Sequence, residues 1–269
     1  MPVVSFLSDY GLGDDFVGVC HGVILGICPE ARIVDVSHGV ARHDVRAGAL
    51  TLRRALPYLP PRVHLAVVDP EVGGERRAVA VRVAEDERIL VGPDNGLLSL
   101  AAARFGGVVE AVDIGRSTHR LEPVSATFHG RDLFAPVAAH LAAGAPLAGA
   151  GDPLGPEELV RLDMPMARLE EDALVVHVIG IDRFGNVMLD VEHEEVTGSR
   201  LRLGRRVSVE VRGQILEATY ASTFVDVAEG AMVLYEDAYR TLSLAVNRGS
   251  AAVALGVGLD AELRLRELS

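Results

Sequence analysis

Apolar and polar positions alternate in two different ways along the chain, and the change comes near residue 165. Before that point, short apolar runs of strand character alternate with segments whose apolar residues recur at helical spacing. The apolar runs are 3–9, 32–38, 63–69, 78–83, 88–92 and 108–114, and the helical segments are 14–29, 44–59, 97–105 and 130–144. This pattern predicts an α/β domain over residues 1–165, with a central, largely parallel sheet flanked by helices.

After residue 172 the helical segments give way to short alternating runs at close spacing. These runs are 173–182, 186–191, 200–204, 206–213, 215–220, 231–236, 242–246 and 261–268. The segment 152–172 between the two patterns is rich in proline and charge, so we place the domain boundary there. We therefore expect a second, smaller all-β domain over residues 172–269, either an antiparallel barrel-like fold or a sandwich.

Three glycines mark the first helical segment. Gly18, Gly22 and Gly26 recur every four residues and so share one face of the helix. We interpret this face as a place where the helix packs closely on the sheet, and a ligand contact is the alternative.

The charge balance limits the partners that the protein can bind. The 269 residues carry a formal net charge of −12, which disfavours nucleic-acid phosphates and tolerates a cationic small molecule. The sequence contains no lysine, which excludes Schiff-base chemistry and a Walker lysine. No uncharged apolar run reaches membrane-spanning length. We expect a small-molecule substrate, with neither nucleic acid nor membrane as a partner.

The two cysteines, Cys20 and Cys28, fall in one predicted helix. Eight residues of helix separate them by ~12 Å along the axis, which is too far for a disulfide. The N-terminal segment has no basic region followed by a long apolar core, so no signal peptide is evident. These features favour a reduced, cytoplasmic setting.

Acidic residues follow several of the predicted strands. Asp9, Asp69 and Asp94 each come at or just after the end of an apolar run. Ligands in open α/β sheets bind outside the carboxyl ends of the strands, so these acids are candidates for a binding site. Their sequence contexts are also ordinary turn formers, which is the structural alternative for each acid.

Two basic residues are candidates to act with Asp69. His129 comes just before a predicted helix, where the helix dipole favours the neutral imidazole and lets it relay a proton. Arg76 precedes the strand that follows Asp69, and Arg77 is its neighbour. Asp69, Arg76 and His129 together could hold a water molecule. The alternatives are a capping or packing role for His129 and, for the two arginines, one buried ion-pair former and one solvated residue.

The segment IDRFGN, residues 181–186, opens the predicted second domain. Phe184 offers a ring face and Asn186 an amide, a combination suited to a purine. A β-turn with Phe184 in the core is the alternative.

The sequence gives little sign of a bound metal or cofactor. His38 and His43 are five positions apart and Asp44 follows, but no clear third and fourth ligand come after them. The sequence lacks G-x-G-x-x-G after a strand, Walker A, G-x-S-x-G, H-E-x-x-H and paired C-x-x-C motifs. We therefore expect no metal and no cofactor.

Six segments, in this order and spacing, resemble one enzyme family. They are SFLSDYGLGDDFVGVCHGVI, ARIVDVSHGVARHDVRAGA, VVDPEVGGERRAVAV, VGPDNGLLS, TFHGRD and IDRFGN. They resemble the S-adenosyl-L-methionine (SAM) hydroxide adenosyltransferases, or SAM hydrolases, which share a fold with the fluorinases and chlorinases. The resemblance covers nearly the whole chain, and the set of motifs is specific although each motif alone is weak.

The resemblance implies an enzyme that converts SAM and water to adenosine and L-methionine. It implies that Asp69, Arg76 and His129 form the triad that handles the attacking water. In the halogenating relatives a tyrosine replaces the aspartate and the arginine is absent. A chlorinase-like, halide-dependent adenosyltransferase is the first alternative, and a non-catalytic protein that binds adenosine or SAM is the second.

The resemblance also implies substrate contacts within the first domain. Asp9 matches the acid that holds the ribose hydroxyls. His43 falls where relatives usually place an aromatic ring against the substrate. Gly130 stands where fluorinases carry a halide-binding serine and chlorinases a glycine.

Further contacts are implied in the second domain. Phe184 and Asn186 match residues that contact adenine, and Asp182 matches the carboxylate that receives the methionine ammonium. The family forms trimers whose substrate lies between the first domain of one subunit and the second domain of the next. Two positions depart from the family pattern, with Glu71 in place of a glycine and Ala238 aligned to a serine that helps to bind the methionine end.

Overall fold

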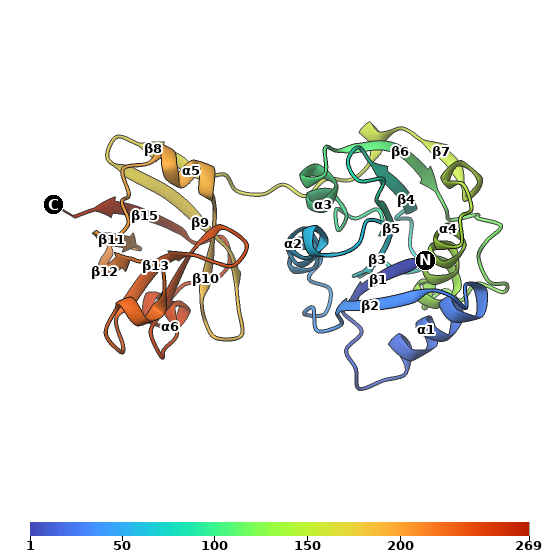
Figure 1. Ribbon diagram of the computed structural model, residues 1–269, viewed down its shortest axis with the longest axis horizontal. Helices are drawn as coiled ribbons and strands as arrows, with labels where there is room; N and C mark the ends of the chain where they lie inside the picture. The colour runs from blue at the N-terminus through green and yellow to red at the C-terminus, as the bar shows by residue number, and fades with distance from the viewer. Residues whose placement is uncertain (269) are drawn as a thin grey trace. The chain divides into compact units, whose positions relative to one another are not determined.

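The computed structural model describes residues 1–268, and the chain divides into two compact units. The first unit is Met1–Leu162 and the second begins at Asp163. This division lies inside the proline-rich and charged segment 152–172. Figure 1 labels the helices α1–α4 in the first unit and, among the strands of the second, β9–β13 and β15.

Within the described residues, the first unit is built on a seven-stranded sheet in the order β2-β1-β3-β5-β4-β6-β7. The strands are β1 (Val3–Ser8), β2 (Arg32–Ser37), β3 (Val63–Val67), β4 (Ala78–Val83), β5 (Ile89–Pro93), β6 (Val108–Asp113) and β7 (Asp152–Leu154). Neighbours among β2, β1, β3 and β5 pair in parallel. The pairings of β4 with β5 and β6, and of β6 with β7, are antiparallel, so the sheet is mixed.

Helices cover both faces of this sheet. They are α1 (Phe16–Ile27), α2 (Val45–Ala55), α3 (Ser99–Arg104) and α4 (Ala135–Ala142). Figure 1 shows these helices around the sheet. Alternate residues of β3 supply two cores, with Leu65 in the core that includes residues of α1 and α4 and Ala66 in the core that includes residues of α2 and α3. The predicted α/β fold is confirmed. In residues 1–268, no helix is long and apolar enough to cross a membrane.

Shorter helical turns complete both units. Single 3₁₀ turns span Leu56–Tyr58, Leu147–Gly149, Pro156–Glu158 and Phe224–Asp226, and a π-helical turn spans Gly130–Phe134 directly before α4.

The strand register shows at which edge of the sheet the acids predicted at strand ends lie. Ser8 of β1 pairs with Val67 of β3, so Asp9 and Asp69 leave their strands at the same edge of the sheet. Because β4 runs in the opposite direction, its amino end lies at this edge too. Arg76, two residues before β4, therefore returns to the edge where Asp69 leaves it.

The predicted close packing of the glycine face of α1 is wrong. Gly18, Gly22 and Gly26 are exposed, and a Cβ atom added at any of them would meet no other atom within 4 Å. The helix buries Val17, Cys20 and Ile24 instead. These apolar side chains occupy the sheet-facing side, which leaves the glycines toward solvent.

The second unit is a closed barrel, which confirms the barrel-like prediction. Among the described residues its ring has seven strands in the order β9-β10-β14-β13-β12-β11-β15, and β15 pairs back to β9. These strands are β9 (Ala173–Ile181), β10 (Val187–Glu192), β11 (Arg206–Val211), β12 (Gln214–Tyr220), β13 (Met232–Glu236), β14 (Thr241–Val246) and β15 (Glu262–Glu267). A further strand, β8 (Arg168–Glu170), pairs with β9 outside the ring.

The strand expected at 200–204 is absent from the described fold. A short helix, α5 (His193–Gly198), precedes this stretch, and Gly204 then turns with a φ of +83°. Leu201 is buried while Arg202 donates hydrogen bonds to nearby backbone carbonyls, so local contacts replace the ladder that the alternating pattern favoured. A second short helix, α6 (Ala251–Leu255), was not predicted either.

Candidate active site

A cavity of about 310 Å³ opens at the sheet edge where β1 and β3 end. Five residues singled out from the sequence line it, namely Asp9, His43, Asp69, His129 and Gly130. They come from segments as far apart as 9 and 130 in the chain, and the fold brings them together. Ligand sites are typically cavities of about 300–1,000 Å³ with a few convergent polar groups, and this one has that character.

Arg76 holds the Asp69 carboxylate from behind the cavity. Its Nε donates to Asp69 Oδ1 at 2.8 Å, and its Nη2 donates to Asp69 Oδ2, so the pair is bidentate. The two side chains are only 4% and 5% exposed. The guanidinium carbon also lies 5.3 Å from the centre of the Phe134 ring. A bidentate, buried arginine fixes the carboxylate in one orientation.

Arg76 also determines the tautomer of His129 and favours its neutral form. Its Nη2 lies 2.8 Å from His129 Nδ1. Since a guanidinium can only donate, Nδ1 must accept, and the proton of the neutral ring then belongs on Nε2. Burial and the Arg76 charge lower the pKa of His129 from its usual value, while Asp69 and Asp132 oppose the shift in part. His129 is therefore neutral near pH 7, with a hydrogen-bond donor at Nε2.

Local backbone geometry assembles this triad. The turn between β3 and Arg76 contains Gly73, whose φ is +78°. A Cβ atom there would lie 2.2 Å from the carbonyl oxygen of Ala126, so the turn touches the segment that leads to His129. His129 itself comes immediately before the π-helical turn, as the sequence predicted for a helix start.

The backbone of His43 contacts the side chain of Asp9. The His43 N–H donates to Asp9 Oδ2 at 2.9 Å, and His43 has a φ of +65°. This contact holds the Asp9 carboxylate at the cavity and leaves its second oxygen for a ligand. The His43 residue is exposed at the rim.

Three aromatic residues of the cavity were missed by the sequence analysis as site residues. Tyr10, Phe16 and Phe128 form a cluster with ring centres 5.0–5.9 Å apart. A Cβ atom at Gly130 would lie 2.1 Å from the Tyr10 hydroxyl, so a glycine at 130 is what lets Tyr10 sit there. The position of Tyr10 directly after Asp9 was the available signal.

Asp94, the third strand-end acid, does not line this cavity. It is buried, accepts from Arg77 Nε at 3.0 Å and from the Val160 N–H at 2.9 Å, and borders a separate cavity of about 180 Å³. The separate cavity is lined mainly by apolar residues and lacks the Asp69, Arg76 and His129 constellation. Asp94 and Arg77 therefore form a structural ion pair.

Comparison with known proteins places this chain in a family. Residues 4–151 match the model of the SAM hydroxide adenosyltransferase N-terminal domain, and residues 176–264 match that of the C-terminal domain. The chain belongs to the SAM hydroxide adenosyltransferase family.

Individual relatives agree over nearly the full length. The chain is 49% identical to an "(R)-S-adenosyl-L-methionine hydrolase" of Salinispora tropica, over 98% of this chain and 97% of that protein. It is 31% identical to a "Fluorinase" of Nocardia brasiliensis, over 98% of this chain and 97% of that protein. The crystal structure of an uncharacterized conserved protein from Thermotoga maritima has a TM-score of 0.92 at 35% identity, covering 98% of this chain and 99% of that one.

The remaining residues that the SAM hydroxide adenosyltransferase resemblance assigned lie on the turn between β9 and β10. Asp182 Oδ1 accepts from the N–H groups of Phe184 and Asn186, and its Oδ2 accepts from Asn186 Nδ2 at 2.8 Å. This network makes the turn rigid. Phe184 is 66% exposed, so the alternative of a core residue is wrong, and the ring is presented at the surface of the second unit.

The two departures from the family pattern are both exposed. Glu71 lies in the turn after Asp69 and Ala238 in the turn after β13. Glu71 is not among the residues that line the cavity.

Proposed function

We propose that the protein hydrolyses SAM to adenosine and L-methionine through attack of water on the ribose 5′-carbon. The observation that carries the proposal is the contact of Arg76 with both Asp69 and His129 beside a cavity that also holds Asp9. The names of the hydrolase relatives support it.

The chemistry needs an aligned water more than a strong acid. The sulfur of SAM is a sulfonium, so it leaves as the neutral thioether of methionine and takes the electrons of the C–S bond. Water forms the new C–O bond and releases one proton. Alignment of the nucleophile with the breaking bond supplies much of the rate, and a positioned base adds about 10²–10⁴-fold.

The hydrogen bonds of the triad divide these tasks between two residues. His129 Nδ1 is engaged by Arg76, so its Nε2–H is a donor that can orient the water oxygen. Each Asp69 oxygen accepts one bond from Arg76 and keeps a further lone pair, and Asp69 lines the cavity. We propose that Asp69 receives the proton and that His129 positions the water.

The charged residues at the cavity suit a cationic substrate. Arg76 alone would repel the sulfonium, but its charge is matched by the Asp69 carboxylate. Asp9 and Asp14 add negative charge to the cavity wall. The Asp9 oxygen that is not bonded to His43 suits a ribose hydroxyl.

The direct test incubates the purified protein with SAM and separates the products by chromatography. Adenosine and methionine in equal amounts support the proposal, and in ¹⁸O-labelled water the label must appear on the 5′-oxygen of adenosine. A second arm adds chloride, and 5′-chloro-5′-deoxyadenosine as the product would favour the halide-dependent alternative. Tight binding of SAM without release of methionine over hours would favour a binding protein.

The sulfur of SAM is a stereocentre, and the relative's name specifies the (R) form. Running the same assay with each separated sulfur epimer tests whether this chain shares that preference. Equal turnover of both epimers would argue against a shared preference.

We further propose a homotrimer in which Asp182, Phe184 and Asn186 of one subunit complete the cavity of another. The exposed ring of Phe184 on a rigid turn supports an interface role, since large exposed aromatic rings are enriched at interfaces. Co-expression of Asp69→Asn subunits with Phe184→Ala subunits tests it. Mixed assemblies should regain activity that neither variant has alone, and an active monomer by light scattering would contradict the trimer.

We propose a cytoplasmic location, supported by two free and buried cysteines, Cys20 and Cys28. Burial raises the pKa of Cys20 to about 12, so its thiol is unreactive toward oxidants. Cell fractionation with a tagged full-length chain checks the location.

A further inference from the structure

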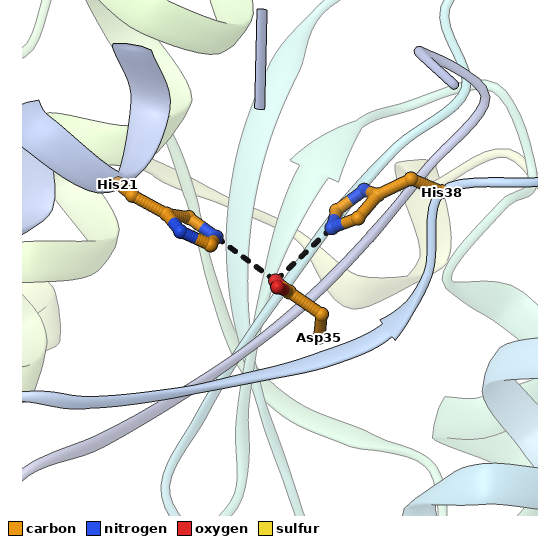
Figure 2. Close-up of side chains that lie close together, drawn as sticks. All are labelled: His21, Asp35 and His38. Carbon is orange, nitrogen blue, oxygen red and sulfur yellow. Dashed lines mark hydrogen bonds and ion pairs between the residues drawn. The ribbon is translucent and has the colours of Figure 1, made fainter. Parts of the chain in front are cut away.

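Three side chains from separate elements of the first unit converge outside the candidate active site (Figure 2). His21 comes from α1, Asp35 from β2 and His38 from the segment that follows β2. His21 Nε2 lies 2.9 Å from Asp35 Oδ1, and His38 Nε2 lies 3.0 Å from the same oxygen. Among residues 1–268 this is the one group of three or more histidine, cysteine or acidic side chains whose ligating atoms lie within 4.8 Å of one another.

His38 is held in an orientation that directs its Nε2 atom at the group. Its side chain is 2% exposed, and its Nδ1 lies 2.7 Å from the buried hydroxyl of Ser8. The Nε2 atom is buried without a well-aligned hydrogen-bond partner. Metal-bound histidines usually make such a bond through the second ring nitrogen, because it fixes the ring and the tautomer. His38 Nε2 is therefore buried and aimed at Asp35 Oδ1, which lies 3.0 Å away.

The spacing suits a small divalent cation. Bonds of about 2.0–2.2 Å from a metal to imidazole nitrogen and carboxylate oxygen, at tetrahedral angles, place neighbouring donor atoms about 3.3–3.6 Å apart. The observed separations of 2.9 and 3.0 Å are a few tenths of an ångström shorter, so a small outward movement of the side chains would admit the ion. His21 and Asp35 are 27% and 43% exposed, so water can reach the group from outside and fill the remaining coordination positions.

We propose that His21, Asp35 and His38 bind a first-row divalent transition-metal ion of the Zn²⁺ class, with water completing the coordination. Two imidazoles and one carboxylate suit Zn²⁺ and its neighbours better than Mg²⁺ or Ca²⁺, which prefer oxygen ligands. The sequence predicted no metal because no third and fourth ligand follow His38 and His43. The fold supplies them instead from residues before His38, and His43 takes no part in the group.

The metal would tie α1 to the end of β2. A ligand that binds the folded protein and not the unfolded chain raises its stability by mass action, so the ion should raise the melting temperature. The proposal does not depend on the proposed hydrolysis, because it assigns the ion no step in that reaction.

Titration calorimetry of the full-length, metal-stripped protein with Zn²⁺ at about pH 7.5, where histidine is neutral, tests the site. We expect one ion per chain and a rise in melting temperature. His21→Ala should weaken Zn²⁺ binding by at least about 100-fold, since even loss of an outer-shell partner costs about 10–100-fold. Asp35→Asn should act in the same direction. Circular dichroism of both variants in chelator confirms that they fold.

His193→Ala is the matched control. His193 is also half-buried and bonded to a carboxylate, Glu236, at 2.8 Å, but it belongs to no group of three donors in the described part of the chain. This variant should bind Zn²⁺ as the parent does. Zn²⁺-soaked crystals should show an anomalous peak between His21, Asp35 and His38. No stoichiometric binding by the parent protein, or equal binding by His21→Ala, would overturn the proposal.

Discussion

Arg76 Nη2 donates a hydrogen bond of 2.8 Å to His129 Nδ1, joining residues that lie 53 positions apart in the sequence. The same guanidinium holds Asp69 through two further hydrogen bonds. Arg76 therefore sets the direction of the carboxylate and the tautomer of the imidazole together. Loss of Arg76 would remove all three of these hydrogen bonds.

The first prediction concerns the pH dependence of turnover. Burial and the Arg76 charge lower the pKa of His129, so the neutral ring should persist below the ordinary value of about 6.5. Protonation at Nδ1 would break the bond from Arg76. We expect kcat/KM to stay level as the pH falls to about 6.5 and to decrease below it. The stabilisation that comes from the neutral ring should be lost over this same lower range, because the folded-state pKa is depressed.

An NMR titration of the imidazole signals, with His129→Gln to assign the resonance, measures the pKa of His129 directly. Replacing Arg76 by methionine should raise that pKa. Titration of the parent ring at or above about 6.5 would contradict the tautomer assignment.

The second prediction concerns Gly130 and Tyr10. Gly130→Ala places a Cβ atom against the Tyr10 hydroxyl, so the ring must move within the cavity. We expect a raised KM for SAM, because Tyr10 lines the same cavity as Asp9 and Asp69. Steady-state kinetics of Gly130→Ala and of the parent protein measure the two KM values.

Gly22→Ala is the control for this substitution. Gly22 lies on the exposed face of α1 with no atom within 4 Å of an added Cβ atom. It should leave KM unchanged and stabilise the protein by up to about 1 kcal/mol, since alanine favours helix over glycine. Unchanged KM in Gly130→Ala would show that the position of Tyr10 does not matter for binding.

The third prediction separates Asp94 from Asp69. Asp94→Ala removes the acceptor of the Val160 N–H and of Arg77 Nε, while Arg77 keeps its contacts with Glu158, and Asp94 is buried. The free energy of unfolding should fall by about 1–3 kcal/mol, while turnover per folded molecule is retained. Chemical denaturation and kinetics on the same preparations measure the two quantities.

Glu229→Ala provides the comparison, since Glu229 pairs with Arg248 where both side chains are at least 69% exposed. Its effect on stability should stay below about 1 kcal/mol. A large loss of turnover in Asp94→Ala would mean that this acid also serves the reaction.

Much of the fold follows from local pattern. The apolar runs at 63–69 and 78–83 became β3 and β4, because β-branched and small apolar residues buried on both faces suit a central strand. The stretch 200–204 alternates polar and apolar residues, a pattern that favours a strand, but the chain turns at Gly204 beside the buried Leu201. Alternation over five residues specifies a strand only when a neighbouring strand is available to pair with it.

The candidate site was predictable where its residues sit at strand ends or helix starts, as Asp9, Asp69 and His129 do. The sequence also placed Arg76 near Asp69, because Arg76 begins the return after the short turn that follows Asp69. It did not show that β5 lies between β3 and β4 in the sheet. His21 and Asp35 were missed for a related reason. They meet because the fold brings α1 beside β2, and the spacing of residues along the sequence does not predict that contact.

The most direct measurement of the central claim compares binding and turnover in Asp69→Asn and Arg76→Ala. Asp69→Asn keeps the shape of the side chain and removes its charge, and thermal unfolding confirms that each variant is folded. Calorimetry should show that the Kd for SAM changes far less than kcat, because neither side chain is proposed to contact the substrate. The unmatched Arg76 charge in Asp69→Asn should weaken binding of the sulfonium somewhat. Under the same conditions kcat should fall by about 10²–10⁴-fold in both variants. Turnover close to that of the parent protein in both would contradict the assignment of Asp69, Arg76 and His129 to the attacking water.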